Sequence, residues 1–375
     1  MSSKIKFIRL SLIFLAVLLP STAPILFAQT DVTAKLEYGN QTFVGKPLGW
    51  DGKRFALLDR AGGLNLIPAN SPDQLQVAAE TFEPYSPDQI VARLTKEFGD
   101  RYYISKTERF VVVHPWGPSS VFAPPFESFH NRFVDFFEAN GIELKSPDFP
   151  QVAIVLRSRN DFNRYLINEI DVRDSRIGGY YSRLSNRITT FDPQGLIRRK
   201  GDPWMYSAGP IIHEANHQSA FNTGLHNRFS PPPKWVSEGV ATLFEARGFN
   251  DASAYKELRD RVNPVRLKAL RKRMERGALR DPLLNLIARD NLFGSDIELA
   301  YALSWGLSFY LYETQPEKYF AFLKKDAQRK NFKVNSPNQR VSEFALAFGN
   351  DFDKLTEELT AYFKPKSDRR IRRNQ

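Results

Sequence analysis

The 375-residue chain contains no cysteine. Disulfide bonds are therefore excluded, and so is lipid attachment through a cysteine thiol. A chain of this length can bury enough apolar surface to be stable without covalent cross-links. We also find no internal repeats, so the sequence does not indicate a repeat architecture.

Long hydrophobic runs are absent after residue 28. Before it, Lys4, Lys6 and Arg9 precede the apolar segment Leu10–Leu19. This order predicts a secretory signal peptide over residues 1–28. The apolar segment is short for a membrane-spanning helix, and a retained membrane anchor is the alternative. We expect an exported protein, periplasmic or extracellular, with no stable membrane span after signal cleavage.

Charge is unbalanced, with a formal net charge of +11 at pH 7. A basic protein can bind nucleic acid, but an exported protein would rarely meet it, so we expect no nucleic-acid partner. An anionic cell-surface polymer would suit this charge better, and a solvated basic surface is the alternative. The segment 364–375 carries six basic residues, and we expect a disordered tail there.

Histidine is scarce, and the five are His114, His130, His213, His217 and His226. Two of them flank a glutamate in the pattern His213-Glu214-x-x-His217. Residues four apart share one face of a helix, so both imidazoles could bind one metal ion. Glu214 would then lie beside the ion, where it could hold a water molecule and accept its proton. A pair of buried structural histidines is the alternative.

The sequence around this pattern predicts its helix. Ile211 and Ile212 suit a helix whose back is buried, and Gly209-Pro210 marks the expected start, because proline is tolerated in a first helical turn.

A catalytic zinc site needs a third protein ligand. A third histidine six residues after His217, as in metzincins, is excluded because Thr223 occupies that position. His226 lies in an expected loop. The better candidate is Glu238, in the first turn of a second predicted helix that follows Pro232-Pro233. Gly239 would allow close helix packing there.

The order of elements predicts two folded units. Residues 32–75 form a small β unit, with strands expected at Ala34–Tyr38, Thr42–Gly49, Arg54–Leu58 and Leu64–Ile67. Residues 68 to about 87 read as a connector. The main domain, 88–363, alternates strands with helices, adds a hairpin before the histidine helix, and is helical beyond Glu245. A mixed sheet with an exposed edge is expected.

Two paired motifs resemble those of the gluzincin zinc metallopeptidases: His213-Glu214-x-x-His217-Gln218 and Trp235-x-x-Glu238-Gly239-x-Ala241. The whole layout looks like uncharacterised secreted bacterial proteins of the peptidase MA-like superfamily. The resemblance implies an α+β, thermolysin-like minimal gluzincin domain preceded by a small β unit. It further implies that His213, His217 and Glu238 bind Zn²⁺ and that Glu214 is the general base. Tyr301 is the candidate donor to the oxyanion, with helix packing as its alternative role.

The chain departs from the gluzincin pattern in two places. The aminopeptidases carry a Gly-x-Met-Glu-Asn segment that captures an amino terminus, whereas Thr189-Thr190-Phe191-Asp192 occupies that region here. In other gluzincins an aspartate four residues after the glutamate ligand supports a histidine. Thr242 stands at that position, where it could form only a weaker bond.

The resulting hypothesis is an exported zinc peptidase that hydrolyses a peptide or protein substrate, as an endopeptidase. The strand Arg187–Phe191 would pair with an extended peptide by β-addition. The alternative is a non-catalytic zinc-containing domain that binds a cell-wall polymer or a protein. The presence of Glu214 favours the enzyme, because a purely structural zinc site does not require that residue.

Overall fold

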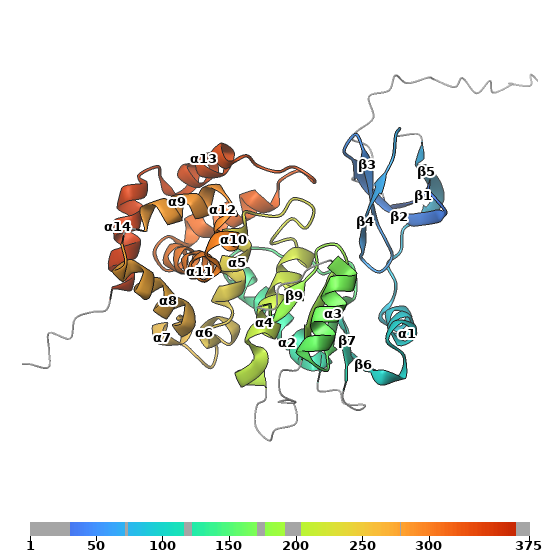
Figure 1. Ribbon diagram of the computed structural model, residues 1–375, viewed down its shortest axis with the longest axis horizontal. Helices are drawn as coiled ribbons and strands as arrows, with labels where there is room; N and C mark the ends of the chain where they lie inside the picture. The colour runs from blue at the N-terminus through green and yellow to red at the C-terminus, as the bar shows by residue number, and fades with distance from the viewer. Residues whose placement is uncertain are drawn as a thin grey trace, which may run out of the picture.

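The computed structural model describes residues 31–71, 74–115, 122–170, 177–191, 204–277 and 279–364. The expected signal peptide lies outside these residues, as does the expected basic tail beyond Lys364. The fold is α+β, with two five-stranded sheets followed by a mainly helical C-terminal part (Figure 1). In the described portion, none of the helices has the length and apolarity to cross a membrane.

The N-terminal sheet is antiparallel throughout, in the order β4-β3-β2-β1-β5. Its strands are β1 (Val32–Tyr38), β2 (Gln41–Trp50), β3 (Arg54–Leu58), β4 (Leu64–Pro68) and β5 (Gln76–Thr81). The four predicted strands are present, but the expected connector contains the fifth. Only β1 pairs with β5, and an edge strand that is largely exposed needs no apolar alternation in its sequence.

This small β unit packs directly on the main domain. The Leu64 backbone N–H donates a hydrogen bond to the Leu184 carbonyl at 2.7 Å. Leu58 and Phe82 form a buried cluster with Phe149 of the main domain. The unit therefore touches the turn between the last two strands of the second sheet.

The second sheet is mixed, in the order β6-β7-β8-β10-β9. Its strands are β6 (Tyr103–Lys106), β7 (Phe110–His114), β8 (Gln151–Leu156), β9 (Gly179–Tyr181) and β10 (Arg187–Phe191). The three inner strands are parallel, and the edge strands β6 and β9 run antiparallel to their neighbours. The expected peptide-binding edge at Arg187–Phe191 is wrong, because β10 has a partner on both sides. The exposed edge near the histidines belongs to β9.

Helices cover both faces of this sheet. One face packs against α1 (Pro87–Phe98) and α3 (Arg159–Ile170), and the other against α2 (Ala123–Ala139) and α4 (Trp204–Asn222). A single 3-10 turn, Gly99–Arg101, follows α1. All six residues of β8 are buried, as expected for a strand covered on both faces.

The C-terminal part is built around one buried helix, α11 (Ile297–Thr314). Around it lie α5 (Lys234–Leu243), α6 (Arg247–Asn250), α7 (Leu258–Arg261), α8 (Pro264–Glu275), α9 (Arg280–Ala288), α10 (Leu292–Ser295), α12 (Pro316–Ala327), α13 (Pro337–Phe348) and α14 (Phe352–Phe363). Gly239 allows α5 to lie close to α11, because a Cβ at that position would be 2.0 Å from the Ser308 Oγ. Close packing on α11 fixes the position of α5, which carries Glu238.

Candidate metal centre

The helix α4 is fixed to the sheet on one side and carries its two histidines on the other. Ile211 and Ala215 belong to the core between α4 and the sheet. The Gln218 side-chain amide donates to the backbone carbonyls of Val152 (3.1 Å) and Asn186 (2.9 Å). His213 and His217 therefore project away from the sheet, toward α5.

The expected helix start at Gly209-Pro210 is wrong. The helix begins at Trp204, and Pro210 lies inside it. Pro210 lies past the first turn and therefore removes one internal hydrogen-bond donor from the helix. The histidine pattern consequently lies in the middle of a 19-residue helix rather than in its first turns.

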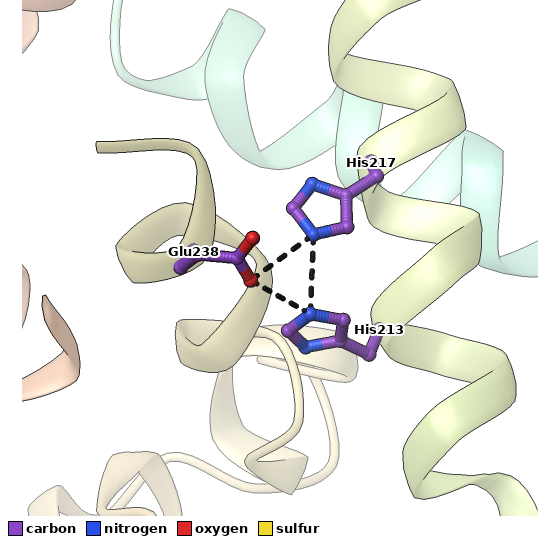
Figure 2. A group of neighbouring side chains, drawn as sticks. All are labelled: His213, His217 and Glu238. Atoms are coloured by element: carbon purple, nitrogen blue, oxygen red, sulfur yellow. Dashed lines mark hydrogen bonds and ion pairs between the residues drawn. The ribbon is translucent and has the colours of Figure 1, made fainter. Parts of the chain in front are cut away.

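Three buried side chains meet where α4 faces α5 (Figure 2). The His213 Nε2 lies 3.1 Å from the His217 Nε2 and 3.1 Å from the Glu238 Oε2, and the His217 Nε2 lies 3.3 Å from the same oxygen. All three residues are buried, each with less than one-tenth of its surface exposed. This group could hold a metal ion.

The spacing of these atoms fits a small metal ion. Zinc–ligand bonds of about 2.0–2.1 Å at tetrahedral angles place neighbouring ligand atoms about 3.3 Å apart. The three distances in the cluster, between 3.1 and 3.3 Å, agree with that geometry. Two imidazole nitrogens and one carboxylate oxygen also leave the fourth position of a tetrahedron open, as catalytic sites require.

Charge around the cluster favours a divalent cation. Three carboxylates surround the imidazoles: Glu214, Glu238 and Glu245. Among the described residues, one basic side chain lies within 4.0 Å of these carboxylates. It is Arg266, at 3.4 Å from the Glu245 Oε1. If all three carboxylates are ionised and both imidazoles are neutral, two negative charges remain for a cation to balance.

The pKa values of His213 and Glu238 move in opposite directions for related reasons. Burial would lower the pKa of His213, but hydrogen bonds to Glu238 and Glu245 raise it well above the ordinary value. Burial would raise the pKa of Glu238, but the two neighbouring imidazoles hold it well below the ordinary value. A proton and a metal ion would therefore compete for the His213 imidazole.

The outer nitrogen of His213 has a carboxylate partner that the sequence analysis missed. The His213 Nδ1 lies 2.9 Å from the Glu245 Oε1. The Asn263 side-chain amide donates to the Glu245 Oε2 at 2.6 Å, and Arg266 lies on the other oxygen. Burial alone would raise the pKa of Glu245, but His213 and these neighbours lower it. An ionised Glu245 fixes the orientation of the His213 ring, as carboxylates behind zinc-binding histidines do.

Thr242, for which the sequence allowed only a weaker bond to a histidine, bonds within its own helix. Its hydroxyl donates to the Glu238 backbone carbonyl at 2.6 Å, which is an internal bond of α5. Glu245 lies seven residues after Glu238, in the turn that follows α5. Extending the search by one turn beyond Thr242 would have found it.

Glu214 is held beside the cluster by the edge strand β9. Its Oε2 accepts a hydrogen bond from the Tyr181 backbone N–H at 2.8 Å. Gly179 leaves space for the side chain, because a Cβ there would be 2.7 Å from the Glu214 Cγ. Burial raises the pKa of Glu214 above the ordinary value, and the neighbouring imidazoles only partly offset this.

The cluster lies at the junction of two adjoining cavities of about 550 and 490 Å³. Both cavities are lined by Gly179, His213, Glu214 and Tyr301, so together they form one cleft that extends to both sides of the cluster.

Tyr301, the candidate oxyanion donor, comes from α11. Its ring centroid lies 6.0 Å from that of His213, and the Arg266 guanidinium lies 4.8 Å from its ring centre. Burial and the charges of Glu238 and Glu214 raise its pKa, so the hydroxyl stays protonated.

The remaining histidines lie outside the cluster. His226, expected in a loop, is buried in the turn after α4 with its Nδ1 near the Leu225 carbonyl. Burial lowers its pKa to about 3. His130 is buried in α2 beside the Ser219 hydroxyl at 3.0 Å.

Comparison with known proteins gives a similarity without a function. Residues 207–333 are similar to a family described as "Protein of unknown function (DUF1570)". No curated protein matches the chain. The matched segment contains the His213–His217–Glu238 cluster together with Glu245 and Tyr301.

Proposed function

We propose that this protein is an exported zinc-dependent peptidase with a thermolysin-like minimal gluzincin domain. One observation carries the proposal: two histidines and a glutamate converge with tetrahedral spacing, and Glu214 is held beside them by the Tyr181 backbone N–H. A structural metal site would not need a buried carboxylate fixed in that place. A mixed sheet whose antiparallel edge strand lies beside the histidine helix supports the finer fold assignment.

Zinc is the proposed metal because two imidazoles and one carboxylate with an open fourth position are a common catalytic zinc set. When bound, such an ion supplies Lewis acidity that polarises a carbonyl oxygen and makes water more acidic. His213, His217 and Glu238 would hold it, and Glu245 would keep the His213 ring in place.

Glu214 performs the proton transfers in this proposal. Its carboxylate accepts a proton from the attacking water and returns it to the leaving amide nitrogen. A buried carboxylate with a raised pKa suits both steps, because it accepts a proton more readily than an exposed carboxylate and can still release it. The Tyr301 hydroxyl would donate a hydrogen bond to the oxyanion that develops on the carbonyl.

The edge strand β9 is the proposed guide for the substrate. Among the described strands it pairs with β10 alone, and it lines the cleft beside Glu214. An extended peptide could add to this edge as a further strand. Because the cleft extends to both sides of the cluster, an endopeptidase is favoured over an exopeptidase.

Metal analysis and a cleavage assay test this proposal together. Purified wild-type protein should contain about one zinc ion per chain and should cleave members of a mixed peptide library. Glu214→Gln should keep the metal and lose cleavage, whereas the control Glu317→Gln, an exposed glutamate on α12, should keep both.

The possible failures point in different directions. A wild-type protein that binds zinc but cleaves no peptide would favour the non-catalytic domain that binds a cell-wall polymer or a protein. A protein that binds no divalent metal would reject both functions.

A further inference from the structure

One arm of the cleft has two basic side chains on its wall. The larger cavity runs from the metal centre to Arg183, in the turn after β9, and to Lys234, the first residue of α5. The Arg183 guanidinium lies 6.0 Å from the Phe221 ring centre, and the Lys234 Nζ lies 5.1 Å from the Phe293 ring centre. Both rings line the same cavity, so these contacts hold both charges at its wall.

Neither charge is neutralised within the described part of the chain. No carboxylate among those residues lies within 4.0 Å of the Arg183 or the Lys234 side chain. Asp290 also lines this arm, but its Oδ1 already accepts from the Arg340 guanidinium at 2.8 Å and from the Lys234 backbone N–H at 3.1 Å. Among the described residues, the Arg183 guanidinium donates one hydrogen bond, to the Arg228 carbonyl at 3.2 Å, which leaves its charge available.

The other arm of the cleft, which is the smaller cavity, differs in the charged side chains on its wall. Its basic residue, Arg266, is already paired with Glu245. It also contains the exposed Glu298, in the first turn of α11. Among the described residues that line the cleft, unneutralised positive charge therefore lies on one side of the metal centre.

The geometry points to a subsite at Arg183 and Lys234 that binds a carboxylate of the substrate. This inference rests on the proposed peptidase function, and it names acidic peptides as the preferred substrate class. The carboxylate belongs either to an aspartate or glutamate side chain or to the carboxyl terminus of the peptide. Arginine presents several donors in one plane and suits such a group, and Lys234 adds a second charge.

Binding to an inactive protein tests the subsite without relying on catalysis. The probe is a fluorescein-labelled peptide series of one sequence, with glutamate or glutamine at one varied position and with a free or amidated carboxyl terminus. Zinc-loaded Glu214→Gln protein should bind the best glutamate or free-carboxyl peptide roughly tenfold more tightly than its neutral match, about the effect of one charge-assisted hydrogen bond. The ratio of the affinities for the charged and the neutral peptide should decrease as the salt concentration is raised.

Variants locate the effect. Arg183→Gln combined with Lys234→Gln should bring the affinity ratio close to one, whereas Arg183→Lys should keep most of it. The matched control, Arg164→Gln with Lys318→Gln, removes the same charge from exposed positions on α3 and α12 and should keep the wild-type ratio. Whether the glutamate or the free terminus gives the larger ratio identifies which carboxylate is bound.

The outcomes separate this inference from the proposed function. Equal affinity for charged and neutral peptides would overturn the subsite, even if the wild type cleaves both. A ratio that falls equally in the control pair would also overturn it. If the wild type cleaves nothing but the Glu214→Gln protein still discriminates through Arg183 and Lys234, the subsite stands and the peptidase proposal fails.

Discussion

The Glu245 Oε1 lies 2.9 Å from the His213 Nδ1, and this contact links the turn after α5 to the outer side of the proposed metal ligand. Because α5 itself supplies Glu238, one short segment both completes the proposed ligand set and orients one of its histidines. Asn263 and Arg266, at the start of α8, hold Glu245 in turn.

We expect Glu245→Gln to weaken zinc binding by about 10- to 100-fold, the usual cost of losing a carboxylate behind a histidine ligand. Competition with a fluorescent chelator measures the affinity directly. The control Glu257→Gln, at an exposed residue directly before α7, should bind zinc like the wild type. Equal affinity in wild type and Glu245→Gln would remove Glu245 from the metal centre.

Gly179→Ala should slow catalysis without loss of metal. The added Cβ would lie 2.7 Å from the Glu214 Cγ, so the carboxylate must move away from its position beside the cluster. Misplacement of a reacting group by about 1 Å can cost about 100-fold in rate. At Gly178 the nearest atom to an added Cβ is the Pro210 Cγ at 3.2 Å, so Gly178→Ala is the neighbouring control. Turnover and zinc content of both variants should be compared, and an unchanged turnover in Gly179→Ala would contradict the role of Gly179.

Tyr301→Phe separates catalysis from packing. If the hydroxyl stabilises the oxyanion, kcat should fall by about 10²- to 10³-fold, and the thermal unfolding midpoint should change little. If Tyr301 only packs against Phe293 and Arg266, kcat should stay near the wild-type value. Steady-state kinetics and thermal unfolding of the same preparation distinguish the two outcomes.

His130 should make stability depend on pH. Burial lowers its pKa to about 4, from 6.5 in the unfolded chain. Because the pKa of His130 is lower in the folded chain than in the unfolded chain, its contribution to the free energy of unfolding is complete above pH 6.5. That contribution is lost as the pH falls from 6.5 toward 4. At pH 5 the loss should be about 2 kcal/mol.

The variant His130→Leu tests this dependence. We compare the decrease in the free energy of unfolding between pH 7.5 and pH 5 in the two proteins. This decrease should be about 2 kcal/mol smaller in His130→Leu than in the wild type. Loss of the Ser219 contact affects both pH values, so the difference between them isolates the titration. Denaturant titration at the two pH values provides the measurement, and equal losses in both proteins would show that His130 does not titrate this way.

Local sequence patterns predicted the ligand cluster because the geometry of a helix is local. His213 and His217 share a face through their spacing, and the second motif placed Glu238 at the start of the next helix. The strands of the small β unit followed equally well from their turn residues, apart from the edge strand β5.

Predictions that depended on tertiary contacts were less successful. The order of strands in the second sheet is not a local property, so the exposed edge was assigned to β10 instead of β9. Glu245 and Arg183 gain their roles from packing between segments far apart in the chain, and neither lies in a recognisable motif.

The contact between the small β unit and the turn at Leu184 has a consequence for how the molecule can be divided. The Leu184 carbonyl accepts hydrogen bonds from the Leu64 N–H and from the Arg228 guanidinium, and Arg183 is its direct neighbour. The turn thus joins three segments: the β unit, the sheet and the loop before α5. A chain shortened to residues 88–363 would keep every proposed metal ligand yet lose one support of the cleft wall. The boundary that separates the two sheets in sequence therefore does not separate a catalytic part from an accessory part.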